Sequence, residues 1–190
     1  MAGAAPPPWL RVVSLTAIAS LGSNVSDTGT VSLTIPAATA TGFYYLIAKA
    51  DGDDALAETN EANNVFAKSI AIGPDLGITN LVYPSVAAAG SSITVSDTTK
   101  NLGAGDSAAS NTRFYLSTNA ALDAGDLLLG SRAVAALAPN ASETGSASVT
   151  IPASVAAGYY YLIAKADGDD ALGETNEFNN TLVRVLQVTP

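Results

Sequence analysis

A twenty-residue block occurs twice in this chain, 116 positions apart, and the two copies are nearly the same. The first copy, YLIAKADGDDALAETNEANN, starts at Tyr45, and the second, YLIAKADGDDALGETNEFNN, starts at Tyr161. They differ at only two pairs of positions, Ala57 with Gly173 and Ala62 with Phe178. Self-similarity at a long fixed period indicates tandem copies of one structural unit. The chain is therefore expected to be a tandem repeat.

The second copy of the block lies in a complete unit, and the first copy lies in a partial one. Residues 74–190 form a complete unit, residues 16–73 match only the back half of that unit, and residues 1–15 are expected to be an irregular N-terminal segment. A length of 190 residues fits one whole domain and part of another. The partial unit is expected to supply the last three or four strands of the fold.

Short alternating segments divided by turn signals fill the complete unit, and no helical period is present. The predicted strands lie within 75–82, 92–98, 112–116, 127–137, 145–151, 159–166 and 181–188. Only 6% of the residues are aromatic although 48% are hydrophobic, and such small and β-branched residues suit thin sheets. The pattern predicts an all-β fold, an antiparallel β-sandwich.

Three consecutive tyrosines open the strand GYYYLIAKA of the complete unit. Lys165 is expected to face solvent, which places Tyr161 and Ile163 on its face and Tyr160 and Leu162 inward. Tyr160 has the position of a tyrosine corner, in which a tyrosine at the start of the penultimate strand bonds to the backbone upstream. A plainer interpretation, β-propensity on a half-buried strand, applies to at least two of the three.

Several short motifs follow one another in the order typical of one family. They are PDL from Pro74, KNLG from Lys100, SNTRFYLST from Ser110, LDAGD from Leu122, IP from Ile151, and the YLIAKAD strand with its ETNEFNN tail. Together they resemble the CARDB module, a cell-adhesion-related domain of bacterial and archaeal surface proteins. The resemblance implies an immunoglobulin-like or fibronectin-III-like sandwich, tandem arrays, an extracellular or cell-surface location and no catalytic activity.

The charge and the apolar segments narrow the range of partners. With a net charge of -9 and only 8 basic residues, the chain is not expected to bind nucleic acid. No apolar run approaches the roughly 18–20 residues that cross a bilayer, so no membrane insertion is expected. Residues 11–19 could be a weak signal peptide. However, they continue into a segment that aligns with 133–137 at the repeat offset, which favours a strand of the fold.

The chain contains no Cys and no His, so disulfides, His/Cys zinc sites and a Ser-His-Asp triad are excluded. A carboxylate pair for glycoside hydrolysis is disfavoured, because the acids crowd into polar loops without an aromatic sugar platform. The only tryptophan, Trp9, lies in the N-terminal segment. An enzyme is therefore not expected.

Ten of the 17 acidic residues lie in the two copies of one loop. Such carboxylates could coordinate Ca²⁺, which takes 6–8 oxygen ligands. The candidate ligands are Asp51, Asp53, Asp54 and Glu58 in the first copy and Asp167, Asp169, Asp170 and Glu174 in the second. An EF-hand is excluded, because Leu56 stands where that loop needs glycine. The alternative is that these side chains bond to their own loop backbone and keep the protein soluble.

A second candidate calcium loop contains Asn119, Asp123 and Asp126, with an ordinary turn as the alternative. Two sequons begin at Asn24 and Asn140, which occupy equivalent turns of the repeat, so the turn interpretation is preferred.

Two functions of different class remain open. The first is a non-catalytic spacer or adhesion domain, whose partners are other repeats of the same protein, surface proteins or glycans. The second is a self-assembling surface-fibre subunit, in which the incomplete first unit is completed by strands from a neighbouring chain.

Overall fold

The computed structural model describes residues 17–18 and 20–190, and the chain divides into a unit that ends at Ala40 and a unit Thr41–Pro190. This boundary falls inside the expected partial repeat 16–73. The expectations for residues 1–15, including Trp9, and for the candidate signal peptide apart from residues 17 and 18 lie outside the described residues.

Almost all regular structure in the described residues is strand. The elements are β1 (Gly42–Lys49), the 3-10 helix η1 (Glu61–Asn63), β2 (Val65–Ile72), β3 (Leu76–Val82), β4 (Val86–Ala88), β5 (Ser92–Asn101), β6 (Ser110–Ser117), β7 (Leu127–Val134), β8 (Ser142–Thr150), β9 (Gly158–Lys165) and β10 (Thr181–Thr189). All seven strands predicted for the complete unit are confirmed. Strand β4 was missed because three residues are too few to show an alternating pattern.

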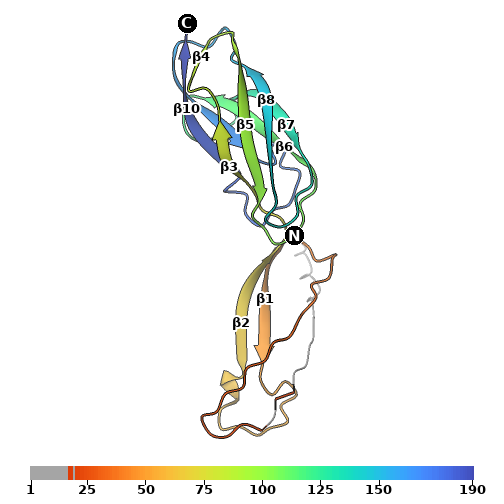
Figure 1. Cartoon of the computed structure of the whole chain (residues 1–190). Helices are drawn as coiled ribbons and strands as arrows, with labels where there is room; N and C mark the ends of the chain where they lie inside the picture. Colours follow the sequence, from red (N-terminus) through yellow and green to blue (C-terminus); the bar gives the residue numbers. More distant parts are fainter. Residues whose placement is uncertain (1–16, 19) are drawn as a thin grey trace, which may run out of the picture. The chain divides into compact units, whose positions relative to one another are not determined.

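Strands β3–β10 form two facing sheets, which Figure 1 shows as layers. One sheet has the order β4-β10-β9-β6-β7 and the other the order β3-β5-β8. Every neighbouring pair is antiparallel except β4 with β10, which is parallel. Both sheets supply the core, and its fully buried members include Leu76, Val95, Phe114, Leu162 and Leu186. The predicted all-β sandwich is confirmed.

Strand β5 shows why part of this core is polar. Its residues alternate between the two faces, as a period of two requires. The inward row begins with Ile93 and Val95 and continues with Asp97, Thr99 and Asn101, all five of them buried. The half of the core toward the end of β5 therefore needs hydrogen-bond partners, because an unpaired buried polar group is costly.

An ion pair buried in that polar half ties the two sheets together. Arg132 on β7 donates to Asp97 on β5, from Nε to Oδ1 at 2.5 Å and from Nη2 to Oδ2 at 2.9 Å. Its Nη1 donates to Glu143 on β8 at 2.8 Å. The hydroxyls of Thr99 and Thr112 also donate to Asp97 Oδ2. Burial opposes the charge on Arg132, but the bonds to Asp97 and Glu143 outweigh it and hold the pKa of the guanidinium above its usual value.

The tyrosine corner is confirmed at the start of β9. The hydroxyl of Tyr160 donates to the carbonyl oxygen of Ala156 at 3.0 Å, and its ring packs against the core. Ile163 was expected to face solvent with Lys165 and is instead fully buried. The reason is that β9 lies between β10 and β6, whose register places Val183 and Tyr115 on either side of Ile163. Large cross-strand neighbours cover an outward residue of a central strand.

Among the described residues of the first repeat, only the hairpin β1–β2 forms a sheet. Residues 26–34, the counterpart of β8, hold no strand, so the prediction of three or four strands is wrong for the residues that the structure describes. In the complete unit β8 pairs only with β5 and β7 only with β6, and these two partners have no counterpart among the described residues of the first repeat. Strands β9 and β10 pair with each other, so their counterparts β1 and β2 keep their partner.

The chain enters and leaves the sandwich at opposite ends (Figure 1). Strand β3 starts at Leu76, which pairs with Asn101, the last residue of β5. Strand β10 ends at Thr189, which pairs with Ala88 and accepts a hydrogen bond from Ala89, close before the start of β5. A strand rises about 3.3 Å per residue, so the ten residues of β5 separate the two ends by about 30 Å.

Candidate functional site

The loop between β9 and β10 and its copy between β1 and β2 are built as turns. Asp167 and Asp51 open the two loops with positive φ angles of 40° and 43°. The carboxylate of Asp51 accepts the backbone N–H groups of Ala55 and Leu56, and that of Asp167 accepts the N–H of Leu172 at 2.8 Å. Both aspartates therefore form the backbone bonds that the turn interpretation expects.

Three other candidate carboxylates form ion pairs on the surface. Asp54 pairs with Lys49 at 2.7 Å, and Asp170 pairs with Lys165 at 2.5 Å. Asp169 pairs with the guanidinium of Arg113. Exposed pairs of this kind stabilise a fold little, but each neutralises one acidic side chain of the loop.

The β9–β10 loop also holds the segment that leads into β3. The carboxylate of Glu174 accepts the backbone N–H of Leu76, and the N–H of Thr175 donates to the carbonyl oxygen of Pro74 at 2.9 Å. These bonds join residues about a hundred positions apart, so no local sequence pattern could show them. They place the loop where the chain enters the sandwich.

Three carboxylates, those of Asp75, Asp167 and Glu177, act electrostatically on Glu174, and the four residues are called the base cluster. The side-chain nitrogen of Asn180 donates to Glu174 Oε1 and to Glu177 Oε2, both at 3.2 Å. The N–H of Ala166 donates to the carbonyl oxygen of Asn180, which brings the next residue, Asp167, to the same place. Within the described residues, no basic side chain forms an ion pair with any of the four carboxylates.

Buried oxygens without a protein partner lie beside the base cluster. They are Oδ1 of Asp167, Oδ1 of Asn179 and Oδ1 of Asn180. Asp167 and Asn180 are each only 1% exposed. The amide of Asn180 is oriented by the two carboxylates that accept from its nitrogen, so its oxygen faces away from them. A buried acceptor without a partner costs about 1–3 kcal/mol, which makes these oxygens candidates for a ligand.

The electrostatics of Glu174 reflect this crowding. The pKa of Glu174 is raised from 4.5 to about 7, chiefly by burial and also by the like charges of Glu177, Asp167 and Asp75, while the N–H of Leu76 opposes the shift. The ionised form of Glu174 is therefore disfavoured in the folded protein.

Because of its raised pKa, Glu174 is expected to contribute less to the free energy of unfolding of the protein as the pH rises. Below about pH 4.5 the group is protonated in both states, and between there and about pH 7 only the unfolded state releases the proton. Its contribution to the free energy of unfolding is thus present at low pH and lost through the folded pKa. With a chelator present, Glu174→Gln is expected to be increasingly more stable than the parent chain as thermal melts move from pH 5 to pH 8. Glu58→Gln, at the same loop position in the first copy, is the matched control.

The loop that holds the second candidate site is closed by its own side chains. Asp123 accepts the N–H of Gly125 at 2.8 Å, and Asp126 accepts the N–H of Asp123 at 2.9 Å. Asn119 accepts the N–H of Ala121 at 2.8 Å. The three predicted residues also line a hollow at the surface. These bonds, too, are those that the turn interpretation expects.

The predicted calcium ligands do not all meet. Asp167 and Glu174 share the base cluster, Asp169 and Asp170 are paired with basic residues, and Asp53 and Glu58 are exposed. In the described part of the chain, no three acidic side chains form a ready-made metal site. Calcium binding stays a prediction. Sequence reasoning missed Asp75 and the amide of Asn180, because only the fold brings them to Glu174.

A family model, CARDB, matches residues 11–68 and again residues 73–184. Similar solved structures include the CARDB domain of a Pyrococcus furiosus protein in complex with di-metal ions, with 22% identity, 61% of this chain and 89% of that chain covered, and a TM-score of 0.47. A solution structure of that domain has 24% identity, covers 61% and 95%, and has a TM-score of 0.47.

A β-glucosidase from Listeria innocua in complex with glucose has 16% identity, covers 66% of this chain but only 17% of that chain, and has a TM-score of 0.44. No curated protein matches the chain. The part of the chain that the structure describes contains no helix long and apolar enough to cross a membrane.

Proposed function

The chain belongs to the CARDB family, and from this premise we propose that it is a non-catalytic spacer module of an extracellular or cell-surface protein of a bacterium or archaeon. Its partners are the neighbouring repeats of the same protein. The family match supports the proposal in one further way: it falls on two successive regions, as a tandem array requires.

The separation of the two ends of the sandwich carries this proposal. The chain enters at Leu76 and leaves at Thr189, and the length of β5 lies between them. A unit built in this way adds its length to an array when another unit follows. A unit whose ends were adjacent would instead add bulk at one point.

The use of the polar side chains also favours a structural role. The buried charges of Asp97 and Arg132 join the two sheets, and the loop carboxylates mostly bond to their own backbone or to surface cations. The whole chain has no His and no Cys, so the commonest general bases and nucleophiles of hydrolases are lacking. Each chemically capable group that the structure describes in the loops has a local structural partner or lies exposed.

Small-angle X-ray scattering tests the spacer function. The full chain is compared with the same chain extended after Pro190 by one and by two further copies of residues 74–190. Each added copy is expected to lengthen the maximum dimension by the same increment, at least about 30 Å. An increment that shrinks with the second copy, because the units fold back on one another, would contradict the proposal.

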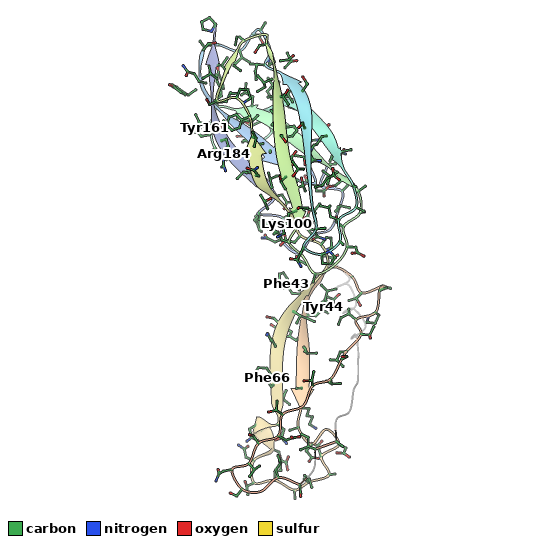
Figure 2. The ribbon with its side chains drawn as sticks, viewed as in Figure 1. Phe43, Tyr44, Phe66, Lys100, Tyr161 and Arg184 are labelled. Carbon is green, nitrogen blue, oxygen red and sulfur yellow. The ribbon has the colours of Figure 1, made fainter. Side chains whose placement is uncertain are left out.

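A second candidate function, self-assembly, rests on the hairpin β1–β2. In the complete unit β6 covers the free edge of β9 and β4 covers that of β10, whereas among the described residues β1 and β2 form a sheet only with each other. Phe43, Ile47 and Phe66 are 73%, 62% and 69% exposed, and Figure 2 shows the two phenylalanines on the hairpin. Unpaired edges with apolar side chains accept strands from other chains. Light scattering decides: growth of mass with concentration supports assembly, and a constant monomer mass supports the spacer alone.

A further inference from the structure

We propose that Asn140 and its counterpart Asn24 are acceptor sites for N-linked glycans, each modified on its side-chain nitrogen. Both residues open an Asn-x-Ser sequence, which is the acceptor pattern for N-glycosylation in secreted proteins. The proposal goes beyond the spacer function, and it rests on the extracellular location proposed with that function.

Asn140 lies on the surface, in the turn that connects β7 with β8. The N–H of Ala141 donates to the carbonyl oxygen of Ala138 at 3.0 Å and closes the turn, and the N–H of Asn140 donates to the carbonyl oxygen of Asn101 at 2.9 Å. Asn140 is exposed and has a φ angle of 65°. Its hydrogen bonds to the described residues are backbone bonds, so its side-chain amide is accessible to an enzyme.

The first repeat has the same arrangement 116 positions earlier. Asn24 is exposed with a φ angle of 60°, and the N–H of Val25 donates to the carbonyl oxygen of Gly22 at 3.1 Å. The two residues before the asparagine and the one after it differ between the copies, whereas the asparagine and the serine of the sequon are the same. The turn accounts for an asparagine, which tolerates a positive φ angle, but it does not require a serine two positions later.

A third sequon, which sequence reasoning missed, shows an acceptor that the fold withholds. Asn179 is followed by Asn180 and Thr181. The nitrogen of Asn179, the atom to which a sugar is attached, donates to Asp75 Oδ1 at 2.8 Å, and the oxygen of the same amide is buried. Asn180, the middle residue of this sequon, is only 1% exposed. The fold thus presents Asn140 and withholds Asn179, although both match the pattern.

The proposed transfer is a substitution at the anomeric carbon of an activated sugar. The side-chain nitrogen of Asn140 forms a bond to that carbon while the bond from the carbon to an oxygen of a diphosphate group breaks. The diphosphate leaves with the electron pair, the amide nitrogen gives up one proton, and nothing is oxidised or reduced. The co-reactants are a glycosyl diphosphate donor and a transferase that recognises the sequon. The acceptor nitrogen has to enter the transferase, which an exposed turn allows.

The turn of Asn140 lies at the entry end of the sandwich. Asn140 bonds to Asn101, which is the last residue of β5 and the pairing partner of Leu76 at the start of β3. A glycan on Asn140 is therefore attached close to the segment 73–75 that leads into β3. Because Asn24 has the equivalent place in the first repeat, the proposal assigns one such glycan to each of the two repeats.

Sugar transfer to the full chain, purified from cells without such a transferase, tests the proposal. The probe is an N-acetylglucosamine disaccharide on a polyprenyl diphosphate, supplied with a single-subunit transferase that accepts Asn-x-Ser/Thr, and the readout is peptide mass spectrometry. In the folded chain the occupancy of Asn140 is expected to exceed that of Asn179 at least tenfold. Peptides 135–147 and 174–186 serve as unfolded references and should both be modified.

Substitutions of the exposed Ser142 separate the sequon from the turn, because they keep Asn140 in place. Ser142→Ala is expected to abolish transfer to Asn140, and Ser142→Thr to retain it. Thermal melts verify that both variants are folded. In protein isolated from the surface of its own cells, the peptide that contains Asn140 is expected to carry the mass of a glycan.

Three results would overturn the glycan sites. One is a folded chain that stays unmodified at Asn140 under conditions that modify peptide 135–147. Another is equal occupancy of Asn140 and Asn179, or transfer to Asn140 that persists in Ser142→Ala. The third is an unmodified Asn140 in protein isolated from the cell surface, which removes the glycan and leaves the proposed location standing. None of them changes the scattering result for the spacer, so the two proposals fail separately.

Discussion

Replacing Asp97 with asparagine is expected to lower the free energy of unfolding of the sandwich by about 3 kcal/mol. The side chains of Arg132 and Asp97 are 7% and 0% exposed, and the carboxylate accepts two of the guanidinium N–H groups. Removing one partner of a buried pair costs about 3–5 kcal/mol, because the other charge is left without compensation. Glu143 still accepts from Arg132, which places the expected loss at the lower end of that range.

Urea denaturation followed by circular dichroism measures the effect at constant m value. The double variant Asp97→Leu with Arg132→Met should recover most of the loss, because apolar replacement of both partners removes the uncompensated charge. Asp54→Asn, which breaks the exposed pair with Lys49, is the control and should change stability little. A single variant as stable as the parent, or a double variant less stable than the single one, would contradict the role given to this pair.

The position of the pair connects it to the proposed function. Asp97 and Glu143 belong to the three-stranded sheet, and Arg132 belongs to the five-stranded sheet. Sheets that pack only through apolar side chains can slide, whereas directional bonds between them fix one arrangement. A spacer benefits from such a fixed arrangement, because its length depends on the two sheets staying in register.

The fold of the complete unit was predictable because its signals are local. Alternation within a strand such as β5, glycine-rich turns and the tyrosine at the start of β9 each depend on residues close in sequence. The prediction that Ile163 faces solvent was wrong for the opposite reason. Its burial depends on Tyr115 and Val183, which only the order of strands in the sheet brings beside it. The alternating pattern of one strand does not show which distant strands pair with it.

In the candidate site, too, the local features could be predicted and the contacts between distant residues could not. Turn formation by Asp51 and by Asp167 follows from the sequence of each loop, and it was predicted as one alternative. The base cluster could not be predicted in full, because Asp75 precedes the complete unit's first strand and Glu174 lies in its last loop. Nearly identical loop sequences therefore acquire different surroundings, which depend on whether the segment into β3 is present beside them.

The hairpin β1–β2 gives the second large expected effect, in amide hydrogen exchange. Residues 45–49 and residues 161–165 have the same sequence, YLIAK, so their intrinsic exchange rates are matched and any difference is structural. Leu162 and Ile163 are 0% exposed, whereas their counterparts Leu46 and Ile47 are 42% and 62% exposed. Strand β9 is bonded on both edges, by β10 and β6, whereas in the part of the chain that the structure describes the strand partner of β1 is β2.

These differences place the two copies at opposite ends of the stability range. Amides of a central core strand exchange through global unfolding, which costs about 5–15 kcal/mol, while a two-stranded hairpin without a buried face opens at almost no cost. In a chain shown to be monomeric, residues 161–165 are expected to exchange at least about a thousandfold more slowly than residues 45–49. Comparable protection of the two copies would mean that the hairpin has a covered face in the monomer, and self-assembly would then lose the exposed edge on which it rests. Protection of residues 45–49 that appears only as the concentration rises would instead identify a second copy as the missing cover.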